Sequence, residues 1–189
     1  MASIKSIHRA QQGIIAAHLS DAKSVVLVAM AYFTNNKLFD LLLKKAQQGL
    51  TVQLIIREDE INTSSGIDFE KLNIAGGEFS FIRNLHHKFC VIDGVTVLTG
   101  SYNWTNQAEY NHEDLTIIAG DIELTVEYMV QFLKIKDPLR KIRKSIETDN
   151  IRKSGNDILA VRRSRRNGVI EKMKERTKKD SNPDKSSNR

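Results

Sequence analysis

The chain has 189 residues, is 40% apolar and 28% charged and carries a formal charge of +6, which excludes a fibrous or wholly disordered protein and indicates one soluble globular domain with surplus sequence. Its longest apolar run, from Val25 to Phe33, is too short for a membrane-spanning helix, which needs roughly 20 residues. The single cysteine, Cys90, excludes an intrachain disulfide, so we expect a fold held by its core in a reducing, cytoplasmic location.

The first twenty residues predict an ordinary helix. Their isoleucines alternate with Gln and Ala too evenly for the compact apolar block of a secretory signal. Basic residues without any acid before Asp21 give a faint likeness to a transit peptide, which is the alternative interpretation.

Strand and helix patterns alternate over the next hundred residues. The run at 25–33 is apolar throughout, as in a strand that is buried on both faces of a sheet, and Gly49 ends the helical spacing that follows it. The expected elements are a central strand at 25–33, a helix at 38–46, a strand at 50–57, a loop at 58–66, a short helix ending at Ala75, a strand at 79–83, a strand at 115–119 and a closing helix at 122–133. This alternation predicts an α/β layered sheet.

A hairpin is predicted between the strands at 79–83 and 115–119. Asp93-Gly94 lies between two apolar, β-branched runs, a pattern typical of a two-residue turn. If Ile92 pairs with Val95, the register places His86 opposite Ser101. The same register places Lys88 opposite Thr99.

Four polar side chains should then converge at the open end of the hairpin. His86 and Lys88 share one face of their strand, Ser101 joins them across the ladder, and Asn103 extends this surface if the strand continues. Such a cluster suits a phosphodiester, because Lys88 and Asn103 can bind its non-bridging oxygens and Ser101 can add a hydrogen bond. His86 is the natural nucleophile. Gly100 either marks a simple bulge or allows close approach of backbone or substrate.

Four neighbouring residues have competing interpretations. His87 faces away from His86 on an ideal strand and is expected to pack or to form an interface. Cys90 is expected to be a buried apolar residue rather than a reactive thiol. Trp104 is expected to pack in the core rather than to stack on a base, and His112 either lies in a loop or contacts substrate.

The charge divides the chain into two parts. Residues 1–138 carry −4, whereas residues 139–189 carry 17 Lys and Arg against 7 Asp and Glu, which is +10. We therefore expect a domain at 1–138 and a basic, helical or disordered C-terminal extension at 139–189. Such an extension suits a polyanion, or it is only a solvated tail. Its densest cluster of positive charge, a candidate substrate-binding site, consists of Arg162, Arg163, Arg165 and Arg166.

The segment HHKFCVIDGVTVLTGSYN at 86–103 resembles the signature of the phospholipase D superfamily, which reads His, any residue, Lys, four residues, Asp, six residues, Gly, Ser, any residue, Asn. The signature positions are occupied by His86, Lys88, Asp93, Gly100, Ser101 and Asn103. The likeness extends over roughly residues 5–135 and includes the strand at 31–34. By size, the nearest members are those with one motif, the Nuc-type bacterial endonucleases and the mitochondrial cardiolipin hydrolase or Zucchini group. The resemblance implies a phospholipase D-like mixed β-sheet between layers of helices.

The resemblance also implies a mechanism. The histidine at position 86 would attack phosphorus to give a phosphohistidine, which water or an alcohol then resolves, with no metal or other cofactor. Glu113 stands at the place of the carboxylate that orients an active-site histidine, and the neighbouring Asp114 is the alternative. Asp93 has two interpretations, structural support within its turn, which we favour, or direct chemistry.

One motif implies two chains. In-line displacement needs a neutral nucleophile and a proton donor for the leaving oxygen, and one imidazole cannot fill both roles in the same step. This sequence has a single such motif, so we expect the second imidazole to be His86 of another subunit. A twofold homodimer with a composite active site follows, as in family members with one motif.

Three functions are compatible with these features. The preferred one is a metal-independent endonuclease for DNA or RNA, to which the basic extension is suited. The second is a phospholipase D or cardiolipin hydrolase whose extension lies on an anionic membrane surface. The third is a nucleic-acid-binding adaptor that has lost catalysis.

Overall fold

The computed structural model describes residues 2–138 and residue 171. The four candidate arginines, and all of the C-terminal extension at 139–189 except residue 171, lie outside these residues. The elements in chain order are β1 (Ser3–Ile7), α1 (Gln11–Asp21), β2 (Val25–Met30), α2 (Asn36–Gln47), β3 (Thr51–Arg57), α3 (Glu60–Thr63), α4 (Glu70–Ile74), β4 (Glu78–Ile82), β5 (Lys88–Ile92), β6 (Thr96–Gly100), a 3₁₀ turn η1 (Gln107–Tyr110), β7 (Leu115–Ala119) and α5 (Ile122–Lys136).

One mixed sheet contains all seven strands, in the order β1-β7-β6-β5-β2-β3-β4. β2, β3 and β4 are parallel, because α2 and α4 provide the crossover connections that parallel neighbours require. β5, β6, β7 and β1 pair antiparallel, and β5 joins the two halves by pairing antiparallel with β2. The predicted α/β class with a mixed sheet is confirmed.

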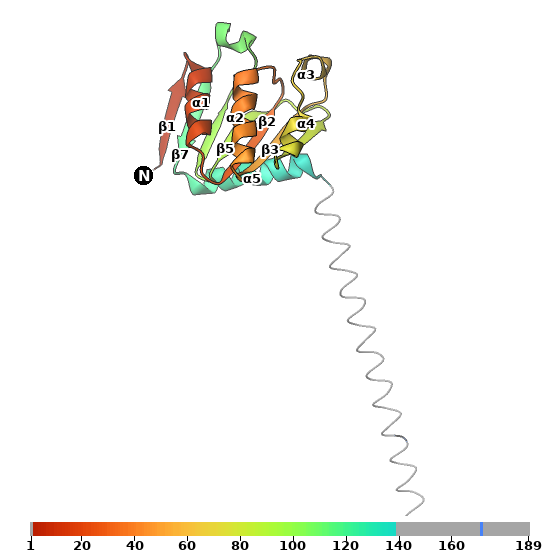
Figure 1. Ribbon diagram of the computed structural model, residues 1–189. Coiled ribbons are helices and arrows are strands. Elements are labelled where there is room, and N and C mark those ends of the chain that lie inside the picture. Colours follow the sequence, from red (N-terminus) through yellow and green to blue (C-terminus); the bar gives the residue numbers. More distant parts are fainter. Residues whose placement is uncertain (1, 139–170, 172–189) are drawn as a thin grey trace, which may run out of the picture. The chain divides into compact units, whose positions relative to one another are not determined.

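Helices cover both faces of this sheet (Figure 1). α1 and α2 lie side by side on one face, and α5 packs on the other, against β2, β4, β5 and β6. β2 contributes to both cores, since Val28 faces α1 and α2 while Ala29 faces α5. Its apolar run is explained by burial on both faces. No helix among the described residues is both long and apolar enough to cross a membrane.

The predicted first helix is wrong at its start. Residues Ser3–Ile7 form β1, which pairs antiparallel with β7 at the edge of the sheet, and the helix begins only at Gln11. Four of the five β1 residues are exposed, so the segment shows no buried face that would mark it as a strand. Its partner lies more than 100 residues further along the chain. Local pattern therefore could not identify it.

The predicted hairpin is present, but its register is shifted by one residue. Ile92 pairs with Thr96, and Phe89, not Lys88, lies opposite Thr99. The turn itself is as expected, because Asp93-Gly94 both have positive φ and the Val95 N–H donates to the Ile92 carbonyl at 3.1 Å. Val95 is the extra residue.

The extra residue has a partner outside the hairpin. The carbonyl of Val95 accepts a hydrogen bond from the N–H of Gly120, the residue after β7, at 2.8 Å, and this contact stabilises the bulged residue. The residue numbers of facing residues therefore add up to 188, whereas the predicted pairing of Ile92 with Val95 gives 187. His86 precedes β5 and is not paired with Ser101 in the ladder.

Candidate active site

The candidate residues meet at one end of the sheet, where β2 ends, β5 begins, β6 ends and β7 begins. The Ala31 N–H donates to the His87 carbonyl at 2.9 Å, so the chain just after β2 lies beside the chain just before β5. On the other side of the hairpin, the N–H groups of Ser101 and Tyr102 both donate to the Asp114 carbonyl, at 3.2 and 3.4 Å. Backbone pairing therefore places segments 31–34, 86–88, 101–103 and 111–114 around one end of the sheet.

His86 and Lys88 are in contact, as their spacing predicts. The Lys88 ammonium lies 3.5 Å from Nε2 of His86 and donates to the His86 carbonyl at 3.1 Å. An ammonium only donates, so this contact favours the tautomer in which Nε2 carries no proton. The His86 side chain is exposed and accessible to a substrate. Burial lowers the pKa of Lys88, and the nearby charge of Glu113 opposes that shift.

Glu113 is the acid of this cluster. It accepts a hydrogen bond from the Ser101 hydroxyl and another from Nδ2 of Asn111 at 3.4 Å, and its carbonyl accepts from Nε2 of Gln11 at 2.9 Å. Asp114 contributes backbone groups instead, because its N–H donates to the Ser101 hydroxyl at 3.1 Å. Within the described residues neither acid hydrogen-bonds the His86 ring. The Ser101 proton is directed to Glu113, so in this arrangement Ser101 holds the acid.

Position 100 requires a glycine, because the backbone of Asp114 approaches it too closely for a side chain. The φ of Gly100 is +154°, and a Cβ at this position would lie 2.3 Å from the carbonyl oxygen of Asp114. Gly100 itself pairs regularly with Leu115, and the N–H groups of Ser101 and Tyr102 after it share the Asp114 carbonyl. Of the two predicted alternatives, the close approach of backbone is the one present, and the close neighbour is Asp114.

Asn103 is oriented by a backbone group that the sequence did not indicate. The N–H of Tyr32 donates to Oδ1 of Asn103 at 3.3 Å, so the amide nitrogen Nδ2 is left to donate to a ligand. Asn103 and Glu113 also border a pocket of about 260 Å³. The other residues lining this flanking pocket are Tyr32, Thr34, Ile61, Thr105, Gln107, Ala108 and Asn111.

Asp93 does not belong to the cluster, although the signature includes it. It lies in the turn at the far end of the hairpin, where its carboxylate accepts hydrogen bonds from the N–H groups of Lys23, Ser24 and Val25 at 2.7 to 3.1 Å. Partial burial raises the pKa of Asp93. These hydrogen bonds, together with one from the Ser24 hydroxyl, lower the pKa by more than burial raises it, so the net shift is downward. We assign Asp93 a structural role, as an anchor between the turn and the start of β2.

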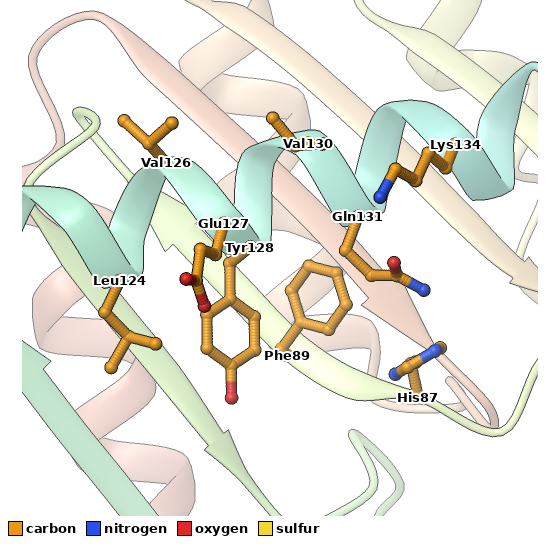
Figure 2. Close-up of a pocket in the computed structure, with 9 residues that line it drawn as sticks. All are labelled: His87, Phe89, Leu124, Val126, Glu127, Tyr128, Val130, Gln131 and Lys134. Carbon is orange, nitrogen blue, oxygen red and sulfur yellow. The ribbon is translucent and has the colours of Figure 1, made fainter.

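His87 lies on the face of the sheet that α5 covers, opposite to the face of Cys90. Figure 2 shows its ring near Phe89 and below the α5 side chains. These residues line a pocket with a volume of about 610 Å³. Burial and the charges of Lys88 and His86 lower the pKa of His87. This pocket is larger than the flanking pocket, but it contains none of the clustered candidates, whereas Asn103 and Glu113 border the smaller one.

The remaining expectations concern core residues and loops. Trp104 is 2% exposed and meets the Phe33 ring edge-on at 5.3 Å, which confirms that it packs in the core. Cys90 is also buried, as predicted, and burial raises the pKa of its thiol. His112 is exposed in the loop before β7. No three His, Cys, Asp or Glu side chains of residues 2–138 are grouped as a metal site.

The sequence did not reveal three of the residues that support the site. Tyr32 was placed in a core strand, Asn111 had no role, and Gln11 fell in a helix pattern without any chemical signal. Gln11 is 3% exposed, and a polar side chain that is buried in this way needs a hydrogen-bond partner, but only the structure shows its burial. Spacing along a hairpin is readable from sequence, whereas these contacts join segments far apart in the chain.

Comparison with known proteins identifies relatives over most of the described residues. Residues 15–136 match the family model described as cardiolipin synthase, PLD-like domain. Mitochondrial cardiolipin hydrolase of Chlamydomonas reinhardtii is 33% identical over 123 residues, which are 64% of this chain and 55% of that protein, and its counterpart in Danio rerio is 29% identical over 62% and 53%. The chain thus spans about half the length of the curated relatives it matches.

Solved structures agree with the fold. Nuc from Salmonella typhimurium, a phospholipase D family member, superposes with a TM-score of 0.65 at 19% identity, over 72% of this chain and 95% of that one. NucT from Helicobacter pylori superposes with a TM-score of 0.57 at 18% identity, over 72% and 97%. At these identities the likeness concerns the fold alone. It covers nearly the whole of both bacterial chains.

Proposed function

The chain belongs to the phospholipase D superfamily, whose members are phosphodiesterases, and from that membership we propose that it is a phosphodiesterase that cleaves nucleic acid. The contact between His86 and Lys88, at the end of the sheet where Glu113 and Asn103 also lie, is the observation that carries this proposal. In this proposal the four residues act as nucleophile, cation, oriented acid and amide donor around one substrate position.

The proposed reaction has two displacements at phosphorus. Nε2 of His86 attacks, an N–P bond forms, and the bond from phosphorus to the leaving oxygen breaks. Lys88 and Nδ2 of Asn103 stabilise the charge on the non-bridging oxygens. Water then attacks the phosphohistidine, the N–P bond breaks and His86 is released. No step of this proposal uses a metal ion.

A second imidazole is needed for the protons. The leaving oxygen must take a proton in the first step, and the attacking water must lose one in the second. We assign both transfers to His86 of a second copy of the chain, because the sequence contains one signature only. The exposed position of His86 supports this assignment, since a partner subunit can reach it.

Charge favours nucleic acid as the substrate. Residues 139–189 carry +10, and a segment of this kind attracts a polyanion through release of counterions. The flanking pocket has amide and hydroxyl side chains in its lining, but its surface is mostly apolar, so the pocket alone does not separate a nucleic acid from a lipid. The positive charge of residues 139–189 is therefore the feature that favours an endonuclease for DNA or RNA.

Hydrolysis of phospholipid head groups is the second candidate. It is favoured by the relatives named mitochondrial cardiolipin hydrolase, one of which is 33% identical to this chain. The chemistry at phosphorus would be the same, and the basic segment would then lie on an anionic membrane surface.

A substrate panel separates these functions. The full chain is incubated, with a chelator present, with plasmid, single-stranded DNA, RNA and cardiolipin-containing liposomes, alongside His86→Ala. We expect cleavage of nucleic acid by the native chain and none by the variant. Release of lipid products without nucleic acid cleavage transfers the assignment to the lipase. Binding of nucleic acid without any cleavage would indicate the inactive adaptor.

A further inference from the structure

The flanking pocket adjoins the phosphate position directly. Asn103 and Glu113 belong both to the catalytic cluster and to the pocket wall. A group bonded to a phosphate held by Asn103 is therefore within reach of the pocket. Its volume of about 260 Å³ is below the range of roughly 300 to 1,000 Å³ that is usual for drug-sized ligands, so it suits a single ring system.

The chemistry of the lining indicates a neutral ligand. Glu113 is the one charged residue among those that border the pocket. A second phosphate would be repelled by Glu113, and no lysine or arginine is among the described residues that line the pocket. Hydrogen-bonding groups are abundant instead, namely Gln107, Asn111 and the two threonines Thr34 and Thr105. Such groups match the donors and acceptors on the edge of a nucleobase.

One wall of the pocket carries an aromatic ring that is held in place. The guanidinium of Arg57 lies over the Tyr32 ring, 5.7 Å from its centroid, and donates to the Tyr32 hydroxyl at 3.3 Å. Arg57 is itself paired with Asp59 at 3.3 Å. A restrained tyrosine at the edge of a pocket offers a flat surface for stacking at little cost in conformational entropy.

Hydrogen bonds also join the two segments that form the pocket, so its shape exists before a ligand binds. The N–H of Thr34 donates to the Trp104 carbonyl at 2.9 Å, and Nδ2 of Asn106 donates to the Thr34 carbonyl at 3.3 Å. Behind them, the buried Asn62 accepts from the Phe33 N–H and donates to the Ala31 carbonyl, both at 2.8 Å. The wall that contains Tyr32 is thus fixed from both sides.

From these observations we propose that the flanking pocket binds the nucleobase adjacent to the scissile phosphate, with Tyr32 as the stacking surface and Gln107 as a hydrogen-bonding partner of the base edge. This inference rests on the proposed nuclease function. It adds that cleavage depends on a base at one defined position and that the enzyme discriminates among bases there.

Single-stranded oligonucleotides with one abasic residue, moved stepwise along the sequence, test the proposal. The rate at each linkage is compared with the same linkage in the intact oligonucleotide. Because stacking on an aromatic side chain contributes substantially to binding a single base, we expect removal of the critical base to slow cleavage about 10-fold or more. The effect should occur on one side of the linkage only. Equal rates at every position would overturn the proposal while leaving the nuclease function intact.

Variants connect the effect to the pocket. Tyr32→Leu should remove most of the difference between intact and abasic substrates, and Gln107→Ala should reduce the discrimination among bases. Tyr110→Leu is the matched control, because Tyr110 is 83% exposed and does not border the pocket. Circular dichroism checks folding, and Tyr32→Phe, which keeps the ring, should retain the base effect. Equal behaviour of Tyr32→Leu and Tyr110→Leu contradicts the inference.

The outcomes also separate the inference from the function on which it rests. If no oligonucleotide is cleaved and liposomes lose head groups, the nuclease proposal and the base pocket both fail. If cleavage requires His86 but ignores the abasic position, only the base pocket fails. Preferential cleavage beside a base, abolished in Tyr32→Leu, supports both.

Discussion

The Ser101 hydroxyl donates a hydrogen bond to the carboxylate of Glu113, between the end of β6 and the start of β7. This relationship connects the Gly-Ser part of the signature to the downstream acid, which the spacing of the sequence alone leaves undecided between Glu113 and Asp114. It also places the acid near Lys88, whose pKa it raises against the effect of burial.

Glu113 is expected to be the more important of the two acids. Glu113→Gln removes the charge beside Lys88 and weakens the acceptor for Ser101, so we expect kcat to fall on the order of 10²-fold. Asp114→Asn is the matched control, because Asp114 supports the site through its backbone, and its effect should be small. Steady-state rates on the substrate identified by the panel measure both. A larger loss in Asp114→Asn than in Glu113→Gln would reverse the assignment.

The pH dependence of substrate binding should report on Lys88. Burial lowers the pKa of this ammonium, so it loses its proton, and with it the attraction for phosphate, at a lower pH than a free lysine does. We expect kcat/KM to fall on the alkaline side below the usual lysine range, which is near pH 10.4. Lys88→Arg keeps its charge and should move this fall to higher pH. In Glu113→Gln the fall should move to lower pH, because the opposing charge is gone.

Two outcomes of these pH profiles would contradict the prediction. If the alkaline fall is unchanged in Lys88→Arg, another group is responsible for it. If it moves with Lys88→Arg but not with Glu113→Gln, Lys88 titrates without the influence of Glu113, and the proximity of these two side chains is not important for activity.

The sequence predicted the elements that have a local signature. β2 was recognisable because both of its faces are buried and its residues are therefore all apolar. The signature spacing predicted the contact between His86 and Lys88, because side chains two positions apart lie on the same face of an extended chain. Both features depend on neighbours within a few residues.

The missed features depend on distant partners. β1 is a strand because of its pairing with β7, and the bulged residue of the hairpin, Val95, is stabilised by its hydrogen bond with Gly120. In the site, Tyr32 orients Asn103 from 71 residues away and Gln11 holds Glu113 from 102 residues away. Such contacts exist only after the sheet has formed, so no local periodicity indicates them.

Asp93 should stabilise the fold without taking part in the reaction. Asp93→Ala removes the acceptor for three backbone N–H groups, and we expect a loss of about 1 to 2 kcal/mol in the free energy of unfolding, as for a helix cap. Because its pKa is lowered in the folded state, this contribution is present above the pKa of the unfolded chain and is lost as the pH falls through the folded pKa.

Chemical denaturation at neutral and acidic pH measures this contribution, and activity is assayed where the variant is folded. The difference between the native chain and Asp93→Ala should shrink in acid. Asp93→Asn keeps an acceptor oxygen and should lose less stability. Loss of activity in a folded Asp93→Ala, on the scale seen for His86→Ala, would return Asp93 to the chemistry.

The final prediction concerns Gly100, which couples the site to the fold. A Cβ in Gly100→Ala would lie 2.3 Å from the Asp114 carbonyl oxygen, so the start of β7 must move away from β6. We expect a loss of roughly 1 to 3 kcal/mol in stability, together with reduced kcat, because Ser101 and Glu113 are displaced from each other. Thermal unfolding and steady-state kinetics measure the two effects.

Gly13→Ala is the matched control for this substitution. Gly13 lies within α1, a Cβ there meets nothing within 4 Å, and alanine is the better helix former by roughly 0.5 to 1 kcal/mol. The control should therefore be neutral or stabilising, with unchanged kcat. Native-like activity in Gly100→Ala would mean that Ser101 and Glu113 tolerate separation and that their hydrogen bond is not needed for activity.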